Sequence, residues 1–344
     1  MLKKIQGLLK GTLKYLRYQL LFQYKLGWLY DLLIQIKNSL FGARVRLEAS
    51  SVCQLQCPAC PTGTGANRGG VIGWGFLKFE GFKKIIDENP RVKRVELSNW
   101  GEIFLNPDLP EIIEYAYIKG VRLEALNGVN LNNVSDETLE FLVKYRFDCI
   151  SVSLDGATHE TYKIYRQKGN LYTVIRNIKR INHFKSEYQS SFPKLLWQFV
   201  VFGHNEHELP KARKMAKELG MSFRPKLNFE PTYSPVRDER YVKIESGLHV
   251  ASRDEFLRKR KRAYLCPCTQ LWDSPQINWD GKLLGCCVNR IGDFGNVFEL
   301  GLNGALNTEV FRYAKRMVLG IEPPREDIPC ISCEVYRTRM ESSA

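Results

Sequence analysis

Three cysteines in one short stretch are the residues best suited to chemistry. Cys53, Cys57 and Cys60 form a C-x3-C-x2-C pattern directly after a strand-like run at 45–48. Three thiolates can hold three irons of a cubane, whereas a complete 4Fe–4S site requires four cysteines, and the next one is the distant Cys149. The spacing therefore predicts a 4Fe–4S cluster with one iron open to a ligand that is not a protein side chain.

A second group of cysteines lies near the end of the sequence, around Asp280-Gly281, which is typical of a β-hairpin turn. Paired cysteines suit iron, and they also suit a tetrahedral zinc site of four thiolates. Because the cysteines cluster at metal-ligand spacings in a chain of 344 residues, we expect reduced thiols and a cytoplasmic protein. Cys149 lies in an apolar run and is interpreted as a small buried hydrophobe. The second group comprises Cys266, Cys268, Cys286, Cys287, Cys330 and Cys333.

Strands alternate with helices from residue 44 to about 226. Six strands in this alternation predict a parallel sheet, either an open doubly wound sheet or a partial barrel. In such barrels the chemistry lies at the carboxyl ends of the strands, and the three-cysteine loop follows the first strand. The predicted strands are Val45–Glu48, Val92–Ser98, Val121–Leu126, Cys149–Leu154, Leu195–Phe202 and Met221–Arg224, and the predicted helices are Phe76–Asn89, Leu109–Lys119, Asp136–Tyr145, His159–Phe184 in two pieces, and Glu206–Leu219.

Polar residues stand at the same edge after two other predicted strands. The run 98–102 ends in Glu102, and the run 151–156 contains Ser153 and Asp155. Carboxylates and hydroxyls placed at strand ends can hold an amine or a sugar. The alternative for each run is a solvated turn with no ligand.

The net charge of +14 is concentrated in part at the N-terminus, where nine basic residues face a single acid in the first 46 residues. Such charge suits nucleic acid, an anionic membrane surface or an anionic substrate. Residues 1–43 read as a basic amphipathic helical extension, and no apolar run reaches the ~18 residues of a membrane-spanning helix. The extension either lies on an anionic membrane or packs on the outside of the core. Residues 227–262 read as a linker with a basic, solvated helical end, so no nucleic acid is expected.

Taken together, these motifs resemble those of the radical SAM enzymes over roughly residues 44–226. That family carries a C-x3-C-x2-C loop after the first strand of a partial (β/α)6 barrel of the TIM type. The resemblance implies S-adenosylmethionine as a cofactor, bound at the open iron of the 4Fe–4S cluster. Trp100 and Ala59 depart from the family pattern, which has Gly and an aromatic residue or Met at these places. The cofactor contacts implied by the resemblance are Glu102 for the amino group, Ser153 and Asp155 for ribose and carboxylate, Asn127 of an Asn-Gly turn, and Arg166 for the methionyl carboxylate.

Residues 263–344 resemble the SPASM domain, a small cysteine-rich module that binds auxiliary clusters in many radical SAM enzymes. The full module holds two clusters and needs cysteines further along, but the eleven residues after Cys333 contain none. The resemblance therefore implies one auxiliary 4Fe–4S cluster, with Cys266 and Cys287 spare or able to substitute for a ligand. The implied ligands are Cys268, Cys286, Cys330 and Cys333.

The activity implied by the resemblance is reductive cleavage of S-adenosylmethionine to a 5′-deoxyadenosyl radical, which abstracts hydrogen from a substrate. The family acts on ribosomal peptides, amino-sugars and other small metabolites, and an electron donor such as flavodoxin or ferredoxin is expected. The basic surface favours an anionic substrate or one carried at a membrane, such as a glycolipid. The rival hypothesis is a non-enzymatic zinc-binding protein that contacts nucleic acid. It accounts for the charge, but it gives no role to the polar strand ends.

Overall fold

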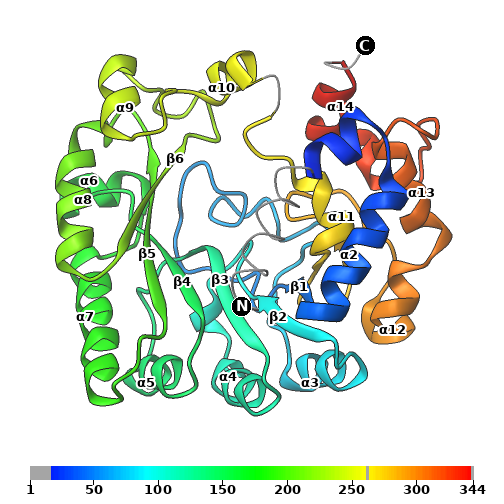
Figure 1. Cartoon of the computed structure of the whole chain (residues 1–344). Helices are drawn as coiled ribbons and strands as arrows, with labels where there is room; N and C mark the ends of the chain where they lie inside the picture. The colour runs from blue at the N-terminus through cyan, green and yellow to red at the C-terminus, as the bar shows by residue number, and fades with distance from the viewer. Residues whose placement is uncertain (1–16, 261–262, 342–344) are drawn as a thin grey trace.

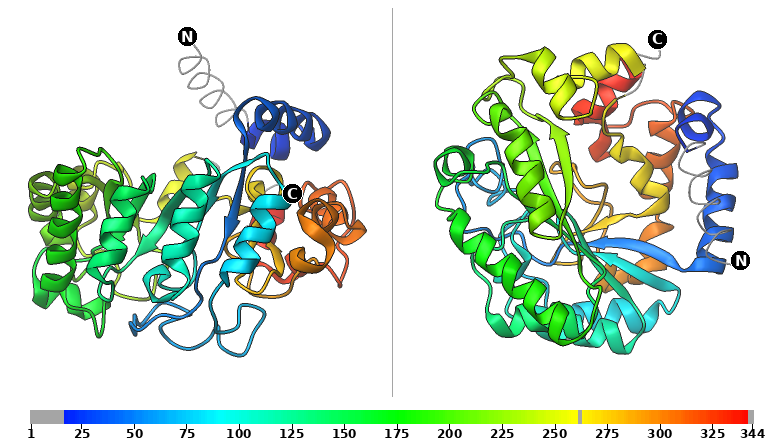
Figure 2. Two further views of the ribbon diagram at one scale, coloured as in Figure 1. Left: turned by 90° about the horizontal axis from the view of Figure 1, so that it is seen from below. Right: turned by 60° about the vertical axis from the view of Figure 1, so that its left-hand side comes forward.

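A computed structural model describes residues 17–260 and 263–341. Six parallel strands lie side by side in chain order and curl into an open arc (Figures 1 and 2). The predicted partial barrel is therefore confirmed. The strands are β1 (Ala43–Leu47), β2 (Val92–Glu96), β3 (Arg122–Val129), β4 (Cys149–Ser153), β5 (Lys194–Val201) and β6 (Ser222–Leu227).

Helices cover the outer side of the arc because their apolar faces pack on the outward residues of the strands (Figure 2). Side-chain caps set several helix starts, such as Ser135 before α5 and Asn170 before α7. The first helix begins later than predicted because Phe76 pairs with Ser50 in a β-bridge. These helices are α3 (Phe79–Glu88), α4 (Leu109–Ile118), α5 (Asp136–Lys144), α6 (His159–Tyr165), α7 (Leu171–Glu187) and α8 (Leu209–Glu218), with 3-10 turns η2 (Ile103–Leu105) and η3 (Glu206–Glu208).

The inner side of the arc is polar. Glu96 on β2 faces the inner side of the arc. Residues paired with it on neighbouring strands point to the same face, because side chains alternate between the two faces of a strand. Arg44 bridges Glu96 at 3.2 Å and Glu124 at 2.9 Å across three strands. Arg94 adds a contact of 3.1 Å to Glu124. The interior is thus built to hold charged and polar groups rather than to fill an apolar core.

The C-terminal unit extends this sheet beyond β1. Strand β7 (Gln276–Ile277) pairs in parallel with β1, and β8 (Leu283–Gly285) pairs antiparallel with β7, as the Asp-Gly turn predicts. Between β6 and this unit lie α9 (Glu239–Glu245) and α10 (Arg253–Arg260). The rest of the unit comprises η4 (Pro267–Thr269), α11 (Gln270–Asp273), α12 (Val297–Leu306), α13 (Glu309–Val318), η5 (Pro329–Ser332) and α14 (Glu334–Glu341).

The N-terminal extension packs mainly on the C-terminal unit. It forms a π-helical turn, η1 (Gln19–Gln23), and α2 (Gly27–Phe41), while residues 1–16 lie outside the described part. Asp31 bridges Lys315 at 3.0 Å, and Arg17 bridges Asp273 at 2.9 Å. Over the described residues, the structure contains no helix with the length and apolarity needed to cross a bilayer.

Candidate active site

The three-cysteine loop follows β1 and lies within the arc of strands (Figure 1). Cys57 is buried, and Cys53 and Cys60 are partly buried. All three belong to one cluster of packed side chains together with Tyr165 and Phe202. Strand β1 therefore delivers the cysteines to the carboxyl edge of the sheet, the edge on which barrels of this type place their chemistry.

Burial favours the protonated form of two of these thiols while they carry no metal. Burial raises the pKa of Cys53 to about 12 and that of Cys57 to about 11. Iron binds thiolates, so metal binding here must release protons into solution. The Cys53 and Cys57 thiols are therefore poor nucleophiles on their own, which favours a structural or metal-ligating role for them.

Arg166 connects the loop to the end of β4. Its guanidinium donates from Nε and Nη2 to Asp155 Oδ2, each at 2.7 Å, and from Nη1 to Cys57 Sγ at 3.8 Å. Asp155 Oδ1 also accepts the backbone N–H of Val200 at 2.8 Å. The pair that the sequence predicts as two cofactor contacts is thus a buried ion pair beside a cysteine.

Glu102 lies at the end of β2 and is buried. Its carboxylate accepts backbone N–H groups from Phe104 and from Asn130, and burial raises its pKa to about 7. Asn130 also donates from Nδ2 toward Cys53 Sγ at 3.7 Å. Glu102 is therefore held next to the cysteine loop through one shared neighbour.

A second buried acid, Glu48, shapes the turn before Glu102. Its carboxylate accepts the backbone N–H of Trp100 at 3.0 Å and that of Gly101 at 3.3 Å. Burial raises the pKa of Glu48 to about 8 against these hydrogen bonds. Gly101 passes so close to the cysteine loop that a Cβ atom there would lie 2.3 Å from Ser50 O.

Asn127 and Ser153 meet at Gln198 on β5. Gln198 Nε2 donates to Asn127 O at 3.3 Å and to Ser153 Oγ at 3.4 Å. Asn127 Nδ2 donates to Asn99 Oδ1 at 2.6 Å, and Asn99 Nδ2 donates to Cys287 O at 3.0 Å. A hydrogen-bonded chain thus runs from the ends of β2, β3, β4 and β5 to the C-terminal unit.

The structure gathers four C-terminal cysteines around one enclosed pocket. They are the four ligands implied from the sequence, Cys268, Cys286, Cys330 and Cys333. Cys287 points elsewhere, since its Sγ accepts a hydrogen bond from Gln270 at 3.3 Å. Cys266 does not line the pocket either. The donor set of four thiols fits a 4Fe–4S cluster.

Neither cysteine group is arranged for a single metal ion. Over residues 17–260 and 263–341, no three His, Cys, Asp or Glu side chains stand close enough to share one ion. A tetrahedral zinc site needs four ligands about 2.3 Å from one atom, whereas a cubane distributes its ligands over four irons.

Glu102 and the pair of Asp155 and Arg166 lie beside the three-cysteine loop, whereas Asn127 and Ser153 meet at Gln198. Reasoning from the sequence missed several neighbours of the loop. Asn130 follows the Asn-Gly turn by two residues, a spacing that could have marked it. The sequence places Glu48 in the first predicted strand and assigns it no role in the site. The structure shows that its carboxylate is buried just before the cysteine loop, where a buried acid is unusual. Phe202 and Tyr233 could not be predicted as neighbours of the loop. They are distant from it in the sequence, and only folding brings their rings together with that of Tyr165.

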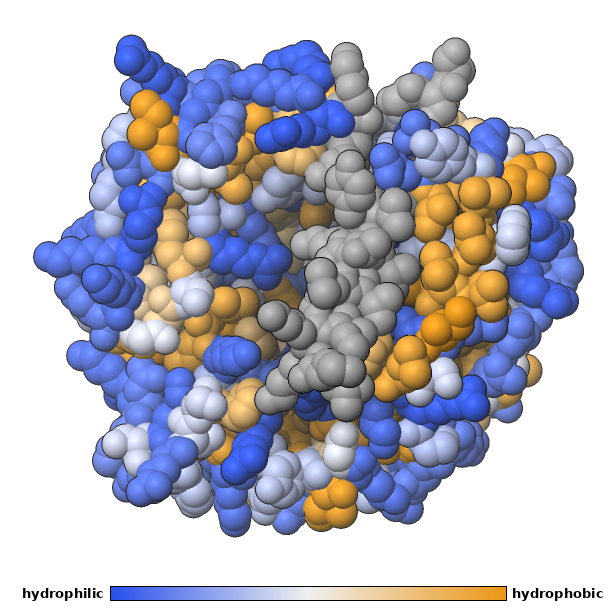
Figure 3. Space-filling model, viewed as in Figure 1, coloured by the Kyte–Doolittle hydropathy of each residue, from blue (hydrophilic) through white to orange (hydrophobic). Residues whose placement is uncertain are grey.

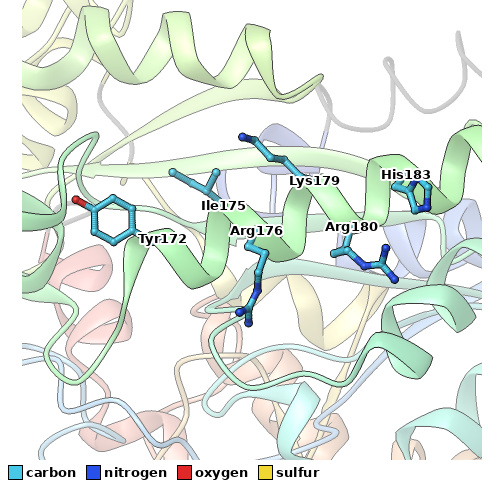
Figure 4. A pocket seen from close by; sticks show the side chains of 6 residues that line it. All are labelled: Tyr172, Ile175, Arg176, Lys179, Arg180 and His183. Atoms are coloured by element: carbon cyan, nitrogen blue, oxygen red, sulfur yellow. The ribbon is translucent and has the colours of Figure 1, made fainter.

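A surface depression on α7 lies apart from this site. Its lining side chains spread along one helix, and Arg176 and Lys179 extend to opposite sides (Figure 4). Arg180 there is paired with Asp136 at 3.1 Å. The side chains do not converge on a common point, so we assign no ligand to this depression. The lining comprises Tyr172, Ile175, Arg176, Lys179, Arg180 and His183.

Comparisons with known proteins agree with this geometry. Residues 47–216 match the family model of the radical SAM superfamily, and residues 266–334 match that of an iron–sulfur cluster-binding domain, SPASM. No curated protein sequence matches the chain.

Solved structures share the fold at low sequence identity. Streptococcus suis SuiB bound to S-adenosylmethionine is 13% identical with a TM-score of 0.60, covering 86% of this chain and 72% of SuiB. Native anSMEcpe with bound AdoMet and the Cp18Cys peptide is 15% identical with a TM-score of 0.53, covering 86% of this chain and 87% of anSMEcpe. SuiB bound to its precursor peptide SuiA is 14% identical with a TM-score of 0.53, covering 86% and 70%.

Proposed function

Because the chain belongs to the radical SAM superfamily and carries a C-terminal iron–sulfur cluster-binding domain, we propose that it abstracts hydrogen from a substrate carbon. The substrate is a peptide, an amino-sugar or glycolipid, or another small metabolite. The observation that carries the proposal is the gathering of Cys53, Cys57 and Cys60 beside the buried pair of Asp155 and Arg166. When bound, the 4Fe–4S cluster and S-adenosylmethionine supply a 5′-deoxyadenosyl radical.

The residues at the strand ends bind and orient the cofactor in this proposal. Cys53, Cys57 and Cys60 hold the cluster, and Glu102 accepts the amino group of S-adenosylmethionine. Arg166 stays paired with Asp155 and offers the side of its guanidinium that faces Cys57 to the methionyl carboxylate. Ser153 and Asn127 supply polar contacts for the rest of the cofactor and are themselves oriented by Gln198.

Residues 263–344 hold one auxiliary 4Fe–4S cluster through Cys268, Cys286, Cys330 and Cys333. Residues 44–226 form the catalytic core, and residues 227–262 connect this core to the C-terminal domain. Reduction of the first cluster requires an electron donor such as flavodoxin or ferredoxin, and we expect the enzyme to meet this donor in the cytoplasm. The peptide in the SuiB and anSMEcpe structures supports a peptide among the candidate substrates.

The decisive experiment is anaerobic reconstitution with iron and sulfide, followed by dithionite and S-adenosylmethionine. We expect roughly seven to eight irons per chain and release of 5′-deoxyadenosine. Cys57→Ala should abolish 5′-deoxyadenosine formation, whereas Cys149→Ala, a matched control outside both cysteine groups, should not. A colourless zinc protein that leaves S-adenosylmethionine intact would instead support the rival, a nucleic-acid-binding module.

We further propose that α2 rests on an anionic membrane surface. Trp28, Leu32, Ile36 and Leu40 repeat every four residues on one side of α2, and each is between 46% and 69% exposed. Figure 3 shows a hydrophobic patch at the position of α2. The single acid of the first 46 residues, Asp31, is paired with Lys315, so the segment as a whole is strongly basic. An apolar stripe in a basic segment is the pattern of an interfacial helix.

Co-sedimentation with vesicles tests this surface. Wild type should pellet with vesicles containing phosphatidylglycerol and much less with neutral phosphatidylcholine vesicles. The double variant Trp28→Glu/Leu40→Glu should remain in the supernatant, whereas Ile118→Glu, an equally exposed apolar position on α4, should behave as wild type. Equal pelleting of all three proteins would refute the membrane contact.

A further inference from the structure

Two cations project from β6 into the interior of the arc. Strand β6 pairs in parallel with β5, with Arg224 beside Gln198 and Lys226 beside Val200. Gln198 points inward, because its amide contacts Ser153 and Asn127 of the candidate active site. Residues paired laterally in a parallel sheet point to the same face, so Arg224 and Lys226 share the interior with that site.

A third cation approaches from α10. Arg253, the first residue of α10, is close enough for its charge to contribute to the lowered pKa of Lys226. Its Nε is buried without a hydrogen-bond partner, and its guanidinium lies 5.3 Å from the ring centre of Tyr264. On the face seen in Figure 3 the molecule is hollowed next to β6, and hydrophilic residues border the hollow.

The acids near this group of cations are engaged by other partners. Asp155 and Glu96 are acids whose charges act on Lys226. Asp155 is bound by Arg166 at 2.7 Å, and Glu96 is engaged by Arg44 at 3.2 Å and by Ser98 Oγ at 2.7 Å.

Arg224, Lys226 and Arg253 make no ion pair with any residue that the structure describes, 17–260 and 263–341. Burial and the neighbouring arginines lower the pKa of Lys226 to about 8. Lys226 and Arg253 are partly buried. Partly buried charges without a counter-ion are costly to the fold, so a ligand that neutralises them would be bound with a gain in free energy.

We propose that Arg224, Lys226 and Arg253 bind a phosphoryl group of the substrate, as a phosphate monoester or a diphosphate. This rests on the proposed function, since it places the phosphoryl group in the interior that the radical would reach. A carboxylate carries one charge and would leave most of the cationic group uncompensated. A phosphoryl group carries about two charges and offers oxygens to two guanidinium forks at once.

Isothermal titration of the reconstituted full-length protein, saturated with S-adenosylmethionine under anaerobic conditions, tests the subsite. The probes are pyrophosphate, inorganic phosphate and acetate at constant ionic strength. We expect binding in the order pyrophosphate, phosphate, acetate. Lys226→Gln and Arg224→Gln should each weaken pyrophosphate binding about tenfold or more, because each removes a charge-assisted hydrogen bond. Lys211→Gln, which removes the same charge from the exposed face of α8, should leave it unchanged.

The outcomes separate this inference from the proposed function. Acetate binding as tightly as phosphate, or unchanged pyrophosphate binding in both β6 variants, would overturn the subsite. Loss of S-adenosylmethionine binding in Lys226→Gln would also overturn the phosphoryl subsite, because it would show that the lysine binds the cofactor rather than the substrate. Failure of wild type to bind S-adenosylmethionine would refute the proposed function alone. If Lys226→Gln does not fold, the exposed Arg224→Gln decides the question.

Discussion

At the scale of single residues, Arg166 is the side chain on which the candidate active site most depends. It is the counter-ion of the buried Asp155 and also reaches Cys57 Sγ. The carboxylate and Cys57 raise the pKa of Arg166 well above its usual range even though burial opposes the charge. The guanidinium therefore stays charged and fixes both the end of β4 and the cysteine loop.

Replacing Arg166 should therefore destabilise the protein strongly. Arg166→Gln leaves the Asp155 charge buried without its partner, for an expected loss of about 3–5 kcal/mol in the free energy of unfolding. Urea unfolding of the reconstituted protein measures it. Arg180→Gln, which breaks an exposed pair with Asp136, should cost no more than about 1 kcal/mol. Equal losses of unfolding free energy in the two variants would contradict the prediction that the Asp155–Arg166 pair stabilises the protein more than an exposed pair does.

The buried acid Glu48 makes stability depend on pH. Its pKa is raised from 4.5 to about 8 in the folded protein, so the fold binds this proton more tightly than the unfolded chain does. The contribution of Glu48 is fully present below pH 4.5 and is lost as the pH rises through about 8. Glu102, whose pKa is raised to about 7, acts in the same direction.

Glu48→Gln cannot ionise, yet it keeps an oxygen that can accept the N–H groups of Trp100 and Gly101. The loss of unfolding free energy between pH 6 and pH 9 should therefore be smaller in the variant than in wild type. Urea titrations at the two pH values measure the difference. Exposed Glu137→Gln serves as the control, with a pH dependence like that of wild type. The same steep loss in Glu48→Gln would refute this assignment.

At the scale of elements, the backbone of the turn after β2 packs directly against the backbone of the loop after β1. A Cβ atom at Gly101 would lie 2.3 Å from Ser50 O and 2.6 Å from Val52 O, which are both backbone atoms. Gly101→Ala should therefore displace the cysteine loop, reduce the iron bound there and lower 5′-deoxyadenosine formation at least about tenfold. Iron analysis and product assay of Gly69→Ala, where a Cβ atom meets nothing within 4 Å, provide the comparison. Full activity in Gly101→Ala would contradict the close fit.

The elements themselves could largely be predicted from the sequence, because their apolar periodicity is local. The spacing of the cysteines is also a local feature of the sequence, so the ligands could be proposed from it. The four implied C-terminal ligands do line one pocket. Contacts between distant segments could not be predicted in the same way. The ion pair of Asp155 with Arg166 and the pairing of β7 with β1 depend on how the arc closes. The polar interior of the arc was missed because a parallel sheet is expected to be apolar on both faces.

At the scale of the whole molecule, one continuous sheet connects the segments that carry the two cysteine groups. Strand β7 pairs with β1, the strand that leads into the three-cysteine loop. Trp279 Nε1 and Asn278 Nδ2 both donate to Ile72 O, at 2.8 Å and 2.9 Å, and so attach the glycine-rich segment after the loop to the C-terminal unit. Asn99 adds a contact to Cys287 O. The C-terminal unit is therefore part of the wall of the active site.

The central claim is that only the first of two clusters has an open iron and binds S-adenosylmethionine there. Electron paramagnetic resonance of the reduced protein, with and without S-adenosylmethionine, tests it most directly. Wild type should hold about eight irons and show a signal that changes when the cofactor is added. The variant Cys53→Ala/Cys57→Ala/Cys60→Ala should keep about four irons and a signal that does not respond. The variant that replaces all four C-terminal ligands should keep about four irons and still respond. A response in the first variant, or none in wild type, would contradict the account.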